Sequence, residues 1–337
     1  MTLKEIAQQA GVSVSTVSRV LNGNAAGAAG EELQKKIWEI ANRGGYTPNQ
    51  HARGLRTGAA DAVRPGRTIA CLYARRTSDP DDAFFTSITF ALEREALAQG
   101  CSVKYSFTAF DVNTPAMTAA LMEEHPDGII VLGRSESDTL SYLEKHFHSV
   151  VSVSLNPVPD RFDQIVCDGY AIGTEIMEKL YDRGHRRIAY IGEISNEVRY
   201  TAYRDFCKAH GIFDPALVSG TVVSAEAGYE GAGVLFKKGV PVDAVFCMGD
   251  IIAIGACRAA REAKLKIPGD VAIMSVDDIE AGQFLSPMLS SVRIPKEEMG
   301  RLAVKLLLDK INRGHTEPLF IRLPYHMIER ESFRWSS

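Results

Sequence analysis

The sequence lacks the features that mark secreted, membrane-spanning and zinc-binding proteins. Its first residues, MTLKEIAQQ, contain no apolar signal core, and no hydrophobic run is long enough to cross a bilayer. The six cysteines form no Cys-x-x-Cys pair and no zinc-ligand spacing, and most of them lie in apolar runs. The sequence therefore predicts a cytoplasmic protein whose cysteines are buried free thiols.

The residue patterns of an enzyme are missing as well. The glycine-rich stretch GNAAGAAG at 23–30 has no following Lys-Ser/Thr, so it is not a phosphate-binding loop. The acidic DPDD at 79–82 has no second ligand cluster and is better explained as solvated surface. His185 stands beside two arginines at a helix-to-strand connection, which favours the surface over a general base. No nucleophile–base pair or carboxylate pair can be nominated, so we expect neither catalysis nor a metal or cofactor.

Length and charge point to two dissimilar parts. A chain of 337 residues with 45% hydrophobic residues is long enough for more than one domain. The net charge of −4 argues against a uniformly basic nucleic-acid binder. However, residues 1–60 carry seven Lys and Arg against four acids, and the remainder carries 31 against 38. A modestly basic head on an acidic body is typical of a DNA-binding domain joined to a domain with another role.

The stretch GVSVSTVSRVLNG at 11–23 predicts a helix from about Val14 with an unusual polar face. Val17, Val20 and Leu21 fall three and four residues apart on one side. The opposite side carries short hydroxyls around one arginine, where a helix built for solubility would carry Glu and Lys. Hydroxyls can contact phosphates, and arginine can read a guanine edge. A solvated amphipathic helix is the alternative for this stretch alone.

The neighbouring segments decide between these interpretations. LKEIAQQA at 3–10 predicts a short helix with an apolar face, preceded by Thr2 with Glu5 three residues on, as in a capping box. EELQKKIWEIANR at 31–43 predicts a third amphipathic helix. Three short helices can share one core, and the first two form a helix-turn-helix whose second helix enters the major groove. DNA binding is favoured over an unrelated helical bundle.

From residue 67 onward, apolar strand-like runs alternate with helical patterns in two successive series. Such alternation predicts parallel sheets flanked by helices, and two series predict two doubly wound lobes. Ligands of such sheets bind beyond the carboxyl ends of the strands, here in a cleft between the lobes. The predicted fold class is therefore α/β, with a small all-α helix-turn-helix head.

The segment TLKEIAQQAGVSVSTVSRVLNG, followed by GYTPN at 45–49, resembles the head of the lactose-repressor/galactose-repressor (LacI/GalR) family. The similarity continues through DGIIVLG, RGHRRIAYIG, AVFCMGDIIAIGACRAAREAKLKIPGDVAIMSVDDI and LSSVRIPKEEMG, and so covers nearly the whole chain. It implies a body like the periplasmic sugar-binding proteins. It also implies a homodimeric repressor of a carbohydrate-utilisation operon that binds pseudo-palindromic double-stranded operator DNA and is released by a small carbohydrate, with no membrane association.

The resemblance implies a division into head, hinge and body. The head is expected over 1–47, the hinge helix and linker over 48–66, and the effector-binding and dimerisation body over 67–337. Within the body, lobe 1 is expected at about 67–167 plus 293–323, and lobe 2 at about 168–292 plus 324–337. In the family the hinge helix folds on DNA and wedges a leucine, matching Leu55, into the minor groove. An ordinary linker is the alternative.

Two sets of site residues follow. The DNA-binding set lies on the head and hinge: Thr2, Leu3, Ser13, Val14, Ser15, Thr16, Ser18, Arg19, Asn22, Asn49, Ala52 and Leu55. The effector-binding set is Tyr73, Phe84, Arg199, Asp250 and Asp277. The arginine and the two acids follow predicted strands and match family positions, whereas Tyr73 and Phe84 are possible stacking surfaces for a sugar ring. Helix N-caps or surface ion pairs are the alternative for the charged members, and core packing for the aromatic ones. Further possible stacking surfaces are Phe85, Tyr229 and Phe284.

Departures from the family pattern concern the pocket. The usual Asn before the first of the strand-end acids is Gly249, the usual Asn-Pro before the paired phenylalanines is Asp82-Ala83, and the usual Gly-Phe before the acid pair is Ser275-Val276. SVDDIEAGQFLSPMLSSVRI is most similar to the β-galactosidase-repressor branch, which implies a galactoside. A solute-binding protein is excluded by the head. A regulator sensing a nucleobase, a sugar phosphate or a protein corepressor remains an alternative.

Overall fold

The computed structural model describes residues 3–21, 30–43, 66–74, 83–107, 114–237 and 241–333. The chain divides into two compact units, Met1–Pro65 and Gly66–Ser337, each of which is described by itself. No helix within these described ranges is long and apolar enough to span a bilayer.

The first unit is the three-helix head. Its helices are α1 (Leu3–Ala10), α2 (Val14–Leu21) and α3 (Glu31–Arg43), as the sequence predicts. Ile6, Val17, Val20 and Ile37 are buried at the centre of these helices. Gly11 has a φ of +74° at the turn between α1 and α2, a conformation that glycine adopts without steric cost. The apolar faces read from the sequence therefore close one small core.

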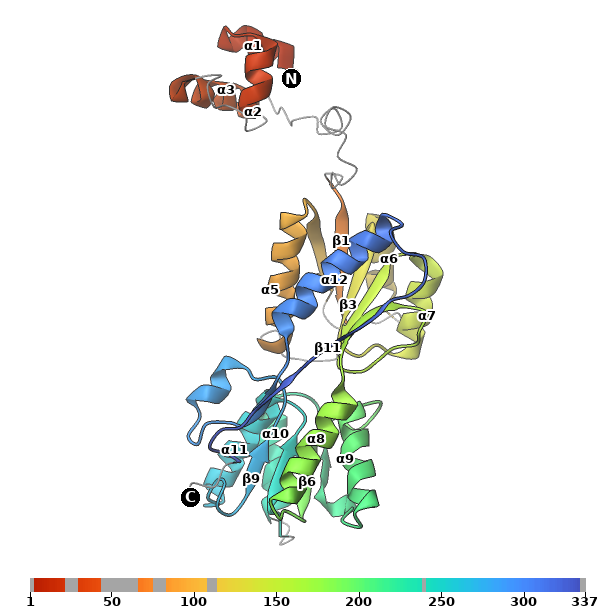
Figure 1. Cartoon of the computed structure of the whole chain (residues 1–337), viewed down its shortest axis with the longest axis vertical. Coiled ribbons are helices and arrows are strands. Elements are labelled where there is room, and N and C mark those ends of the chain that lie inside the picture. The colour runs from red at the N-terminus through yellow and green to blue at the C-terminus, as the bar shows by residue number, and fades with distance from the viewer. Residues whose placement is uncertain are drawn as a thin grey trace. The chain divides into compact units, whose positions relative to one another are not determined.

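The second unit contains two parallel sheets. The larger has the strand order β11-β5-β4-β3-β1-β2, and its strands all pair in parallel. Its strands are β1 (Thr68–Tyr73), β2 (Ser102–Phe107), β3 (Gly128–Leu132), β4 (Val150–Ser154), β5 (Asp163–Cys167) and β11 (Phe320–Leu323). Its helices are α5 (Ala83–Ala98), α6 (Pro115–Glu124), α7 (Ser137–His146) and α12 (Lys296–Ile311). Helices α5 and α12 pack on one face, and α6 and α7 on the other (Figure 1).

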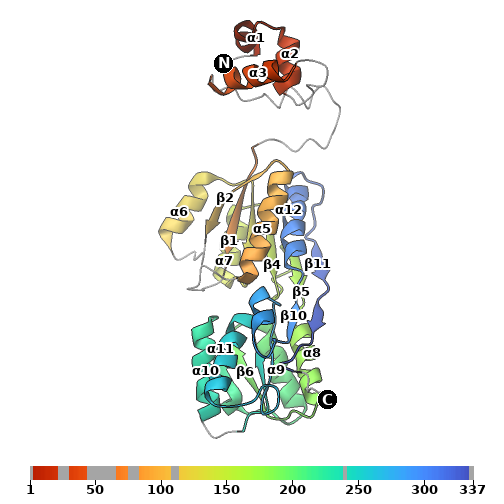
Figure 2. The same cartoon turned by 90° about the vertical axis from the view of Figure 1, so that its left-hand side faces the viewer.

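The smaller sheet has the order β7-β6-β8-β9. Its strands are β6 (Ile188–Gly192), β7 (Val218–Gly220), β8 (Ala244–Cys247) and β9 (Ala272–Met274). The surrounding elements are α8 (Gly169–Asp182), α9 (Val198–Ala209), α10 (Ala225–Lys237), α11 (Asp250–Glu262), and the 3-10 helices η1 (Pro215–Leu217) and η2 (Glu280–Phe284). Figure 2 shows α10 and α11 together on one flank of this sheet.

Three chain segments connect the sheets: the step from β5 into α8, the segment through β10 (Ser291–Arg293), and the step from β11 to β12 (His326–Ile328). Strands β10 and β12 pair antiparallel. Side chains that follow β3 and β4 contact side chains that follow β6, so the carboxyl ends of the two parallel sheets face each other. The alternating strands and helices predicted from residue 67 onward are confirmed.

Helices α10 and α11 approach each other through glycine. A Cβ at Gly228 would collide with the backbone of Ile252, and a Cβ at Gly255 would collide with the backbone of Ala225 and Tyr229. The contact between these helices is therefore made by main-chain atoms from both sides. Because α11 begins at Asp250, this contact fixes the helix that starts at the cleft.

Burial of the cysteines is confirmed for five of the six, and Cys257 is half-buried. Burial raises the pKa of Cys71 and of Cys167 to about 12, so both stay protonated thiols at neutral pH. The surface position expected for His185 is wrong. Its side chain is buried with Nδ1 3.4 Å from Asp243 Oδ1, because Asp243 also accepts the Arg186 and Arg187 backbone N–H groups and draws the turn inward.

Candidate functional site

The polar face of α2 is built around a capping serine. The Ser13 hydroxyl accepts the Thr16 backbone N–H at 3.1 Å, and it lies 2.8 Å from Ser15 Oγ. Ser15 and Arg19 are exposed, and Val14 keeps 44% of its surface open to solvent. The helix start therefore presents hydroxyls, one apolar group and one guanidinium outward, while its other face closes the head's core.

Several predicted DNA-binding residues lie outside the part of the chain that the structure describes. They are Thr2, Asn22, Asn49, Ala52 and Leu55, and the side chains of Leu3 and Ser18 lie outside it too. Their assigned roles, and that of the hinge, stay predictions.

In the body, a buried ion pair between Arg199 and Glu197 lies where the strand ends of the two sheets meet. Arg199 Nε donates to Glu197 Oε1 at 2.6 Å and its NH2 donates to Oε2 at 3.0 Å, while NH1 donates to the Met248 carbonyl at 2.9 Å. Glu197 also caps α9 by accepting the Arg199 backbone N–H. The pair is local in sequence because the helix start turns the carboxylate back over the guanidinium.

The charges of this pair stabilise one another against burial. Burial alone would raise the pKa of Glu197, but the Arg199 guanidinium outweighs it and lowers that pKa to about 2. Burial alone would lower the pKa of Arg199, but the Glu197 carboxylate outweighs it and raises that pKa above its usual value. Both side chains are therefore charged at neutral pH.

Two side chains from the six-stranded lobe reach the same carboxylate. Arg134, which follows β3, donates to Glu197 Oε2 at 3.1 Å and to Glu193 Oε2 at 2.9 Å. Asn156, which follows β4, accepts the Val198 N–H at 3.0 Å and has its amide 3.5 Å from Glu197 Oε2. Glu197 thus joins the two lobes. Sequence reasoning missed all three residues; a glutamate at the cap position of the helix carrying Arg199 was the available signal.

The acid pair after β9 separates into two roles. The Asp278 side chain is only 3% exposed and accepts Arg293 Nε at 2.7 Å and Arg330 NH2 at 2.6 Å. These arginines outweigh burial and lower the Asp278 pKa. Asp277 lies near Arg199, and its charge helps to raise the Arg199 pKa. Asp277 has a φ of 114°, and its backbone carbonyl accepts the Lys296 ammonium. Such rare backbone conformations in L-residues concentrate at functional sites.

The space for the Asp277 carboxylate depends on Gly249. A Cβ at position 249 would stand 2.8 Å from Asp277 Oδ2, closer than ordinary packing allows. The family's usual asparagine at this position would push the carboxylate away. Glycine in place of the family's usual asparagine at position 249 therefore leaves room for the Asp277 carboxylate.

Asp250 has its hydrogen-bonding capacity taken up within its own lobe. Oδ1 accepts the hydroxyls of Ser275 and Ser291, and Oδ2 accepts the Ile279 N–H at 2.8 Å. Burial raises its pKa to about 6, while these hydrogen bonds act to lower it. The arrangement ties the start of α11 to the segments after β9 and β10. The effector-binding role predicted for Asp250 stays a prediction.

The aromatic candidates are dispersed. Tyr73 and Phe85 meet edge-to-face at 5.9 Å, Phe84 and Phe85 meet at 5.2 Å, and both phenylalanines are buried. The Tyr229 hydroxyl donates to Glu262, and the Arg258 guanidinium lies over its ring. Phe284 is 80% exposed. Only Tyr73, at the end of β1, combines a strand-end position with partial exposure.

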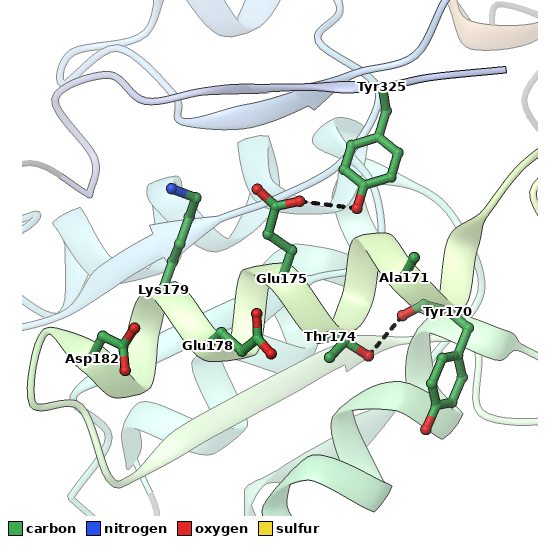
Figure 3. Close-up of a pocket in the computed structure, with 8 residues that line it drawn as sticks. All are labelled: Tyr170, Ala171, Thr174, Glu175, Glu178, Lys179, Asp182 and Tyr325. Atoms are coloured by element: carbon green, nitrogen blue, oxygen red, sulfur yellow. Dashed lines mark hydrogen bonds between the residues drawn. The ribbon is translucent and has the colours of Figure 1, made fainter.

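A hollow lies along α8, and none of the predicted site residues lines it (Figure 3). The Tyr325 hydroxyl donates to Glu175 across it, and Lys179 pairs with Glu329 at 2.9 Å near its end. These contacts attach the C-terminal segment to α8. Within the described ranges, no group of three His, Cys, Asp or Glu side chains could hold a metal ion.

A helix-turn-helix unit joined to a two-lobed α/β body defines a DNA-binding transcriptional regulator rather than an enzyme. Residues 2–49 match the bacterial regulatory proteins of the lacI family, and residues 177–333 match the periplasmic binding protein-like domain. The chain belongs to the lacI family of transcriptional regulators.

Full-length relatives support this assignment. The ribose operon repressor of Haemophilus influenzae is 30% identical, over 98% of both chains. The transcriptional repressor MelR of Bacillus subtilis is 29% identical, over 98% of this chain and 96% of its own. A transcriptional regulator CelR–cellobiose complex is 26% identical, has a TM-score of 0.72, and covers 98% of this chain and 99% of its own. The lac repressor dimer bound to operator has a TM-score of 0.76 at 20% identity, with 99% of both chains covered, and so shares the fold.

Proposed function

We propose that the protein is a homodimeric, cytoplasmic repressor of a carbohydrate-utilisation operon, and that a small neutral sugar binding at Arg199 releases it from its operator. The observation that carries this proposal is the buried guanidinium of Arg199 at the meeting point of the strand ends, with donors to spare. A planar guanidinium suits vicinal hydroxyls. The sugar-bound CelR relative and the ribose operon repressor support a sugar as the effector class.

The proposed sugar contacts come from both lobes. Arg199 and Asp277 belong to the lobe of the four-stranded sheet, whereas Tyr73 and Arg134 belong to the other. A ligand that contacts both sets favours one arrangement of the lobes and can therefore bias an equilibrium. Closure of the cleft would change the placement of the lobes from which the linkers leave, and so disfavour paired hinges on DNA. A galactoside is the first sugar we would test.

The proposed dimer uses an exposed apolar face. Phe90 and Leu97 stand on one side of α5 and are 64% and 77% exposed, and Phe284 of η2 is also exposed. Figures 1 and 2 agree in showing α5 and η2 on the same side of the body. Exposed apolar patches of this kind mark interfaces, and a two-fold dimer would bury the same patch from both subunits. The two heads would then read a pseudo-palindromic site.

The test is a reciprocal binding measurement on the purified chain with its operator. Thermal shifts against galactosides, other mono- and disaccharides, nucleobases and sugar phosphates identify the effector. Calorimetry with and without operator DNA should then show that operator DNA lowers the affinity for the sugar by the same factor by which the sugar lowers the affinity for operator DNA. If operator DNA instead raises the affinity for the sugar, the small molecule is a corepressor, and the proposed release of the repressor by the sugar is wrong.

We propose that Arg19, which is exposed one turn into α2, contacts a base edge, so Arg19→Ala is expected to weaken binding to the specific operator by about 1–3 kcal/mol and to relax sequence preference. Thr16→Ala serves as the comparison, because loss of a phosphate contact acts evenly across sequences. Fluorescence anisotropy on operator and random DNA measures both. If Arg19→Ala lowers the affinity for operator and random DNA equally, Arg19 does not contact base edges.

A further inference from the structure

The charge balance around Arg199 constrains what can bind there. A guanidinium carries five N–H donors. Three of them are engaged, by the two Glu197 oxygens and the Met248 carbonyl, which leaves two within the described residues. A ligand can use those two donors without displacing anything. It meets a guanidinium whose positive charge is already matched by a carboxylate.

Glu197 is difficult to displace. Oε1 accepts the Nε and the backbone N–H of Arg199, and Oε2 accepts Arg199 NH2 and Arg134 NH1. Only 2% of the residue is exposed. A carboxylate with this many charge-assisted hydrogen bonds in a buried setting holds its place against a competing anion.

We infer that Glu197 sets the charge class of the effector: it reserves Arg199 for an uncharged polyhydroxy ligand and excludes sugar acids and sugar phosphates. The inference rests on the proposed function, because it takes Arg199 as the point of effector contact. An anion there would either compete with Glu197 for the guanidinium or stand beside the carboxylates of Glu197 and Asp277. Specific sites commonly reject a competitor by such like-charge placement.

Asp277 works in the same direction. Its carboxylate occupies the space that a side chain at position 249 would fill, and its negative charge acts on Arg199. A hydroxyl group can both donate and accept hydrogen bonds, and it carries no charge to oppose Asp277. A phosphate or carboxylate oxygen can only accept, and it would face Asp277 as a like charge. The charges around Arg199 therefore favour hydroxyl groups over anionic groups.

The test uses neutral and anionic ligands of the same ring: galactose against galacturonate and galactose 1-phosphate, and glucose against glucuronate. Calorimetry on the full chain should show that the wild type prefers the neutral member of a pair by at least 100-fold. Glu197→Gln keeps the side-chain oxygen that caps α9 but removes the charge. It should lower that preference at least tenfold by admitting the anionic member.

Asp205→Asn is the matched control, because it removes one charge from the helix that carries Arg199 without touching Arg199, Arg134 or Glu197, and its preference should stay within threefold of the wild type. Wild-type binding of an anionic member as tight as its neutral partner overturns the inference. So does a folded Glu197→Gln variant that admits no anionic member. If Glu197→Gln does not fold, the wild-type ratio alone decides.

Nucleobases tested in the same way separate the two proposals. If free adenine or hypoxanthine binds tightly and no tested sugar binds, the proposed function as a sugar-responsive repressor is wrong. The charge rule would survive that result, provided the corresponding nucleoside monophosphates are rejected.

Discussion

Arg199→Ala is expected to give a repressor that binds its operator but can no longer be released by the sugar. The substitution removes a buried guanidinium that has two N–H donors not engaged by the described residues. A hydrogen bond to a charged group typically contributes about 1.5–3 kcal/mol, which corresponds to a loss of affinity of about 10-fold or more. Operator binding depends on the head, which the substitution does not touch.

Two measurements check this expectation: calorimetry of the sugar that shifts the wild type, and operator anisotropy with and without that sugar. Arg204→Ala is the control, because Arg204 lies on the same helix but pairs with Asp205 at half-exposed positions. It should behave as the wild type in both assays. Retention of normal induction by a folded Arg199→Ala protein would place the effector elsewhere.

Glu197→Ala is expected to lower the free energy of unfolding of the body by about 3–5 kcal/mol, since it leaves a buried guanidinium without its counter-ion. It also removes the cap of α9 and the anchor for Arg134 and Asn156. The double variant Glu197→Ala/Arg199→Ala should be more stable than Glu197→Ala alone, because the uncompensated charge is gone.

Urea unfolding followed by circular dichroism measures the series. Glu298→Ala removes an exposed ion pair with Arg301 and should leave unfolding close to the wild type. If the losses in unfolding free energy of Glu197→Ala and Arg199→Ala simply add up in the double variant, the two side chains do not stabilise each other.

The same pair predicts a pH dependence. The folded pKa of Glu197 is lowered to about 2 from an ordinary value of 4.5, so its stabilising contribution is present above about pH 4.5 and is lost as the pH falls toward 2. The free energy of unfolding of Glu197→Gln should therefore fall less than that of the wild type between pH 4.5 and pH 2. The remaining fall comes from the titration of other carboxylates.

Local patterns were enough to predict the architecture. The faces of α1, α2 and α3 follow from apolar spacing alone, and Ser13 as the cap of α2 follows from its position before Val17 and Val20. The alternation after residue 67 predicts parallel sheets because each strand needs a covering helix. These properties depend on residues within a few positions of one another.

The site could be predicted only in part, because its contacts join distant residues. Arg134 reaches Glu197 from 63 positions away, and Asp250 binds Ser275 and Ser291 from 25 and 41 positions away. The family likeness pointed to Arg199 but not to the acid that neutralises it. His185 was misplaced for the same reason, since the burial of its side chain depends on Asp243 across the sheet edge.

The contact between α10 and α11 has a mechanical consequence. Side chains can absorb a displacement by changing rotamer, whereas touching main-chain atoms cannot. Gly228 and Gly255 put backbone against backbone, so the two helices act as one stiff plate. Because Asp250 begins α11, a displacement of the start of α11 is passed to α10 through this contact, at Ala225 and Tyr229. Most of the compliance must then come from the three connecting segments and little from within the lobe.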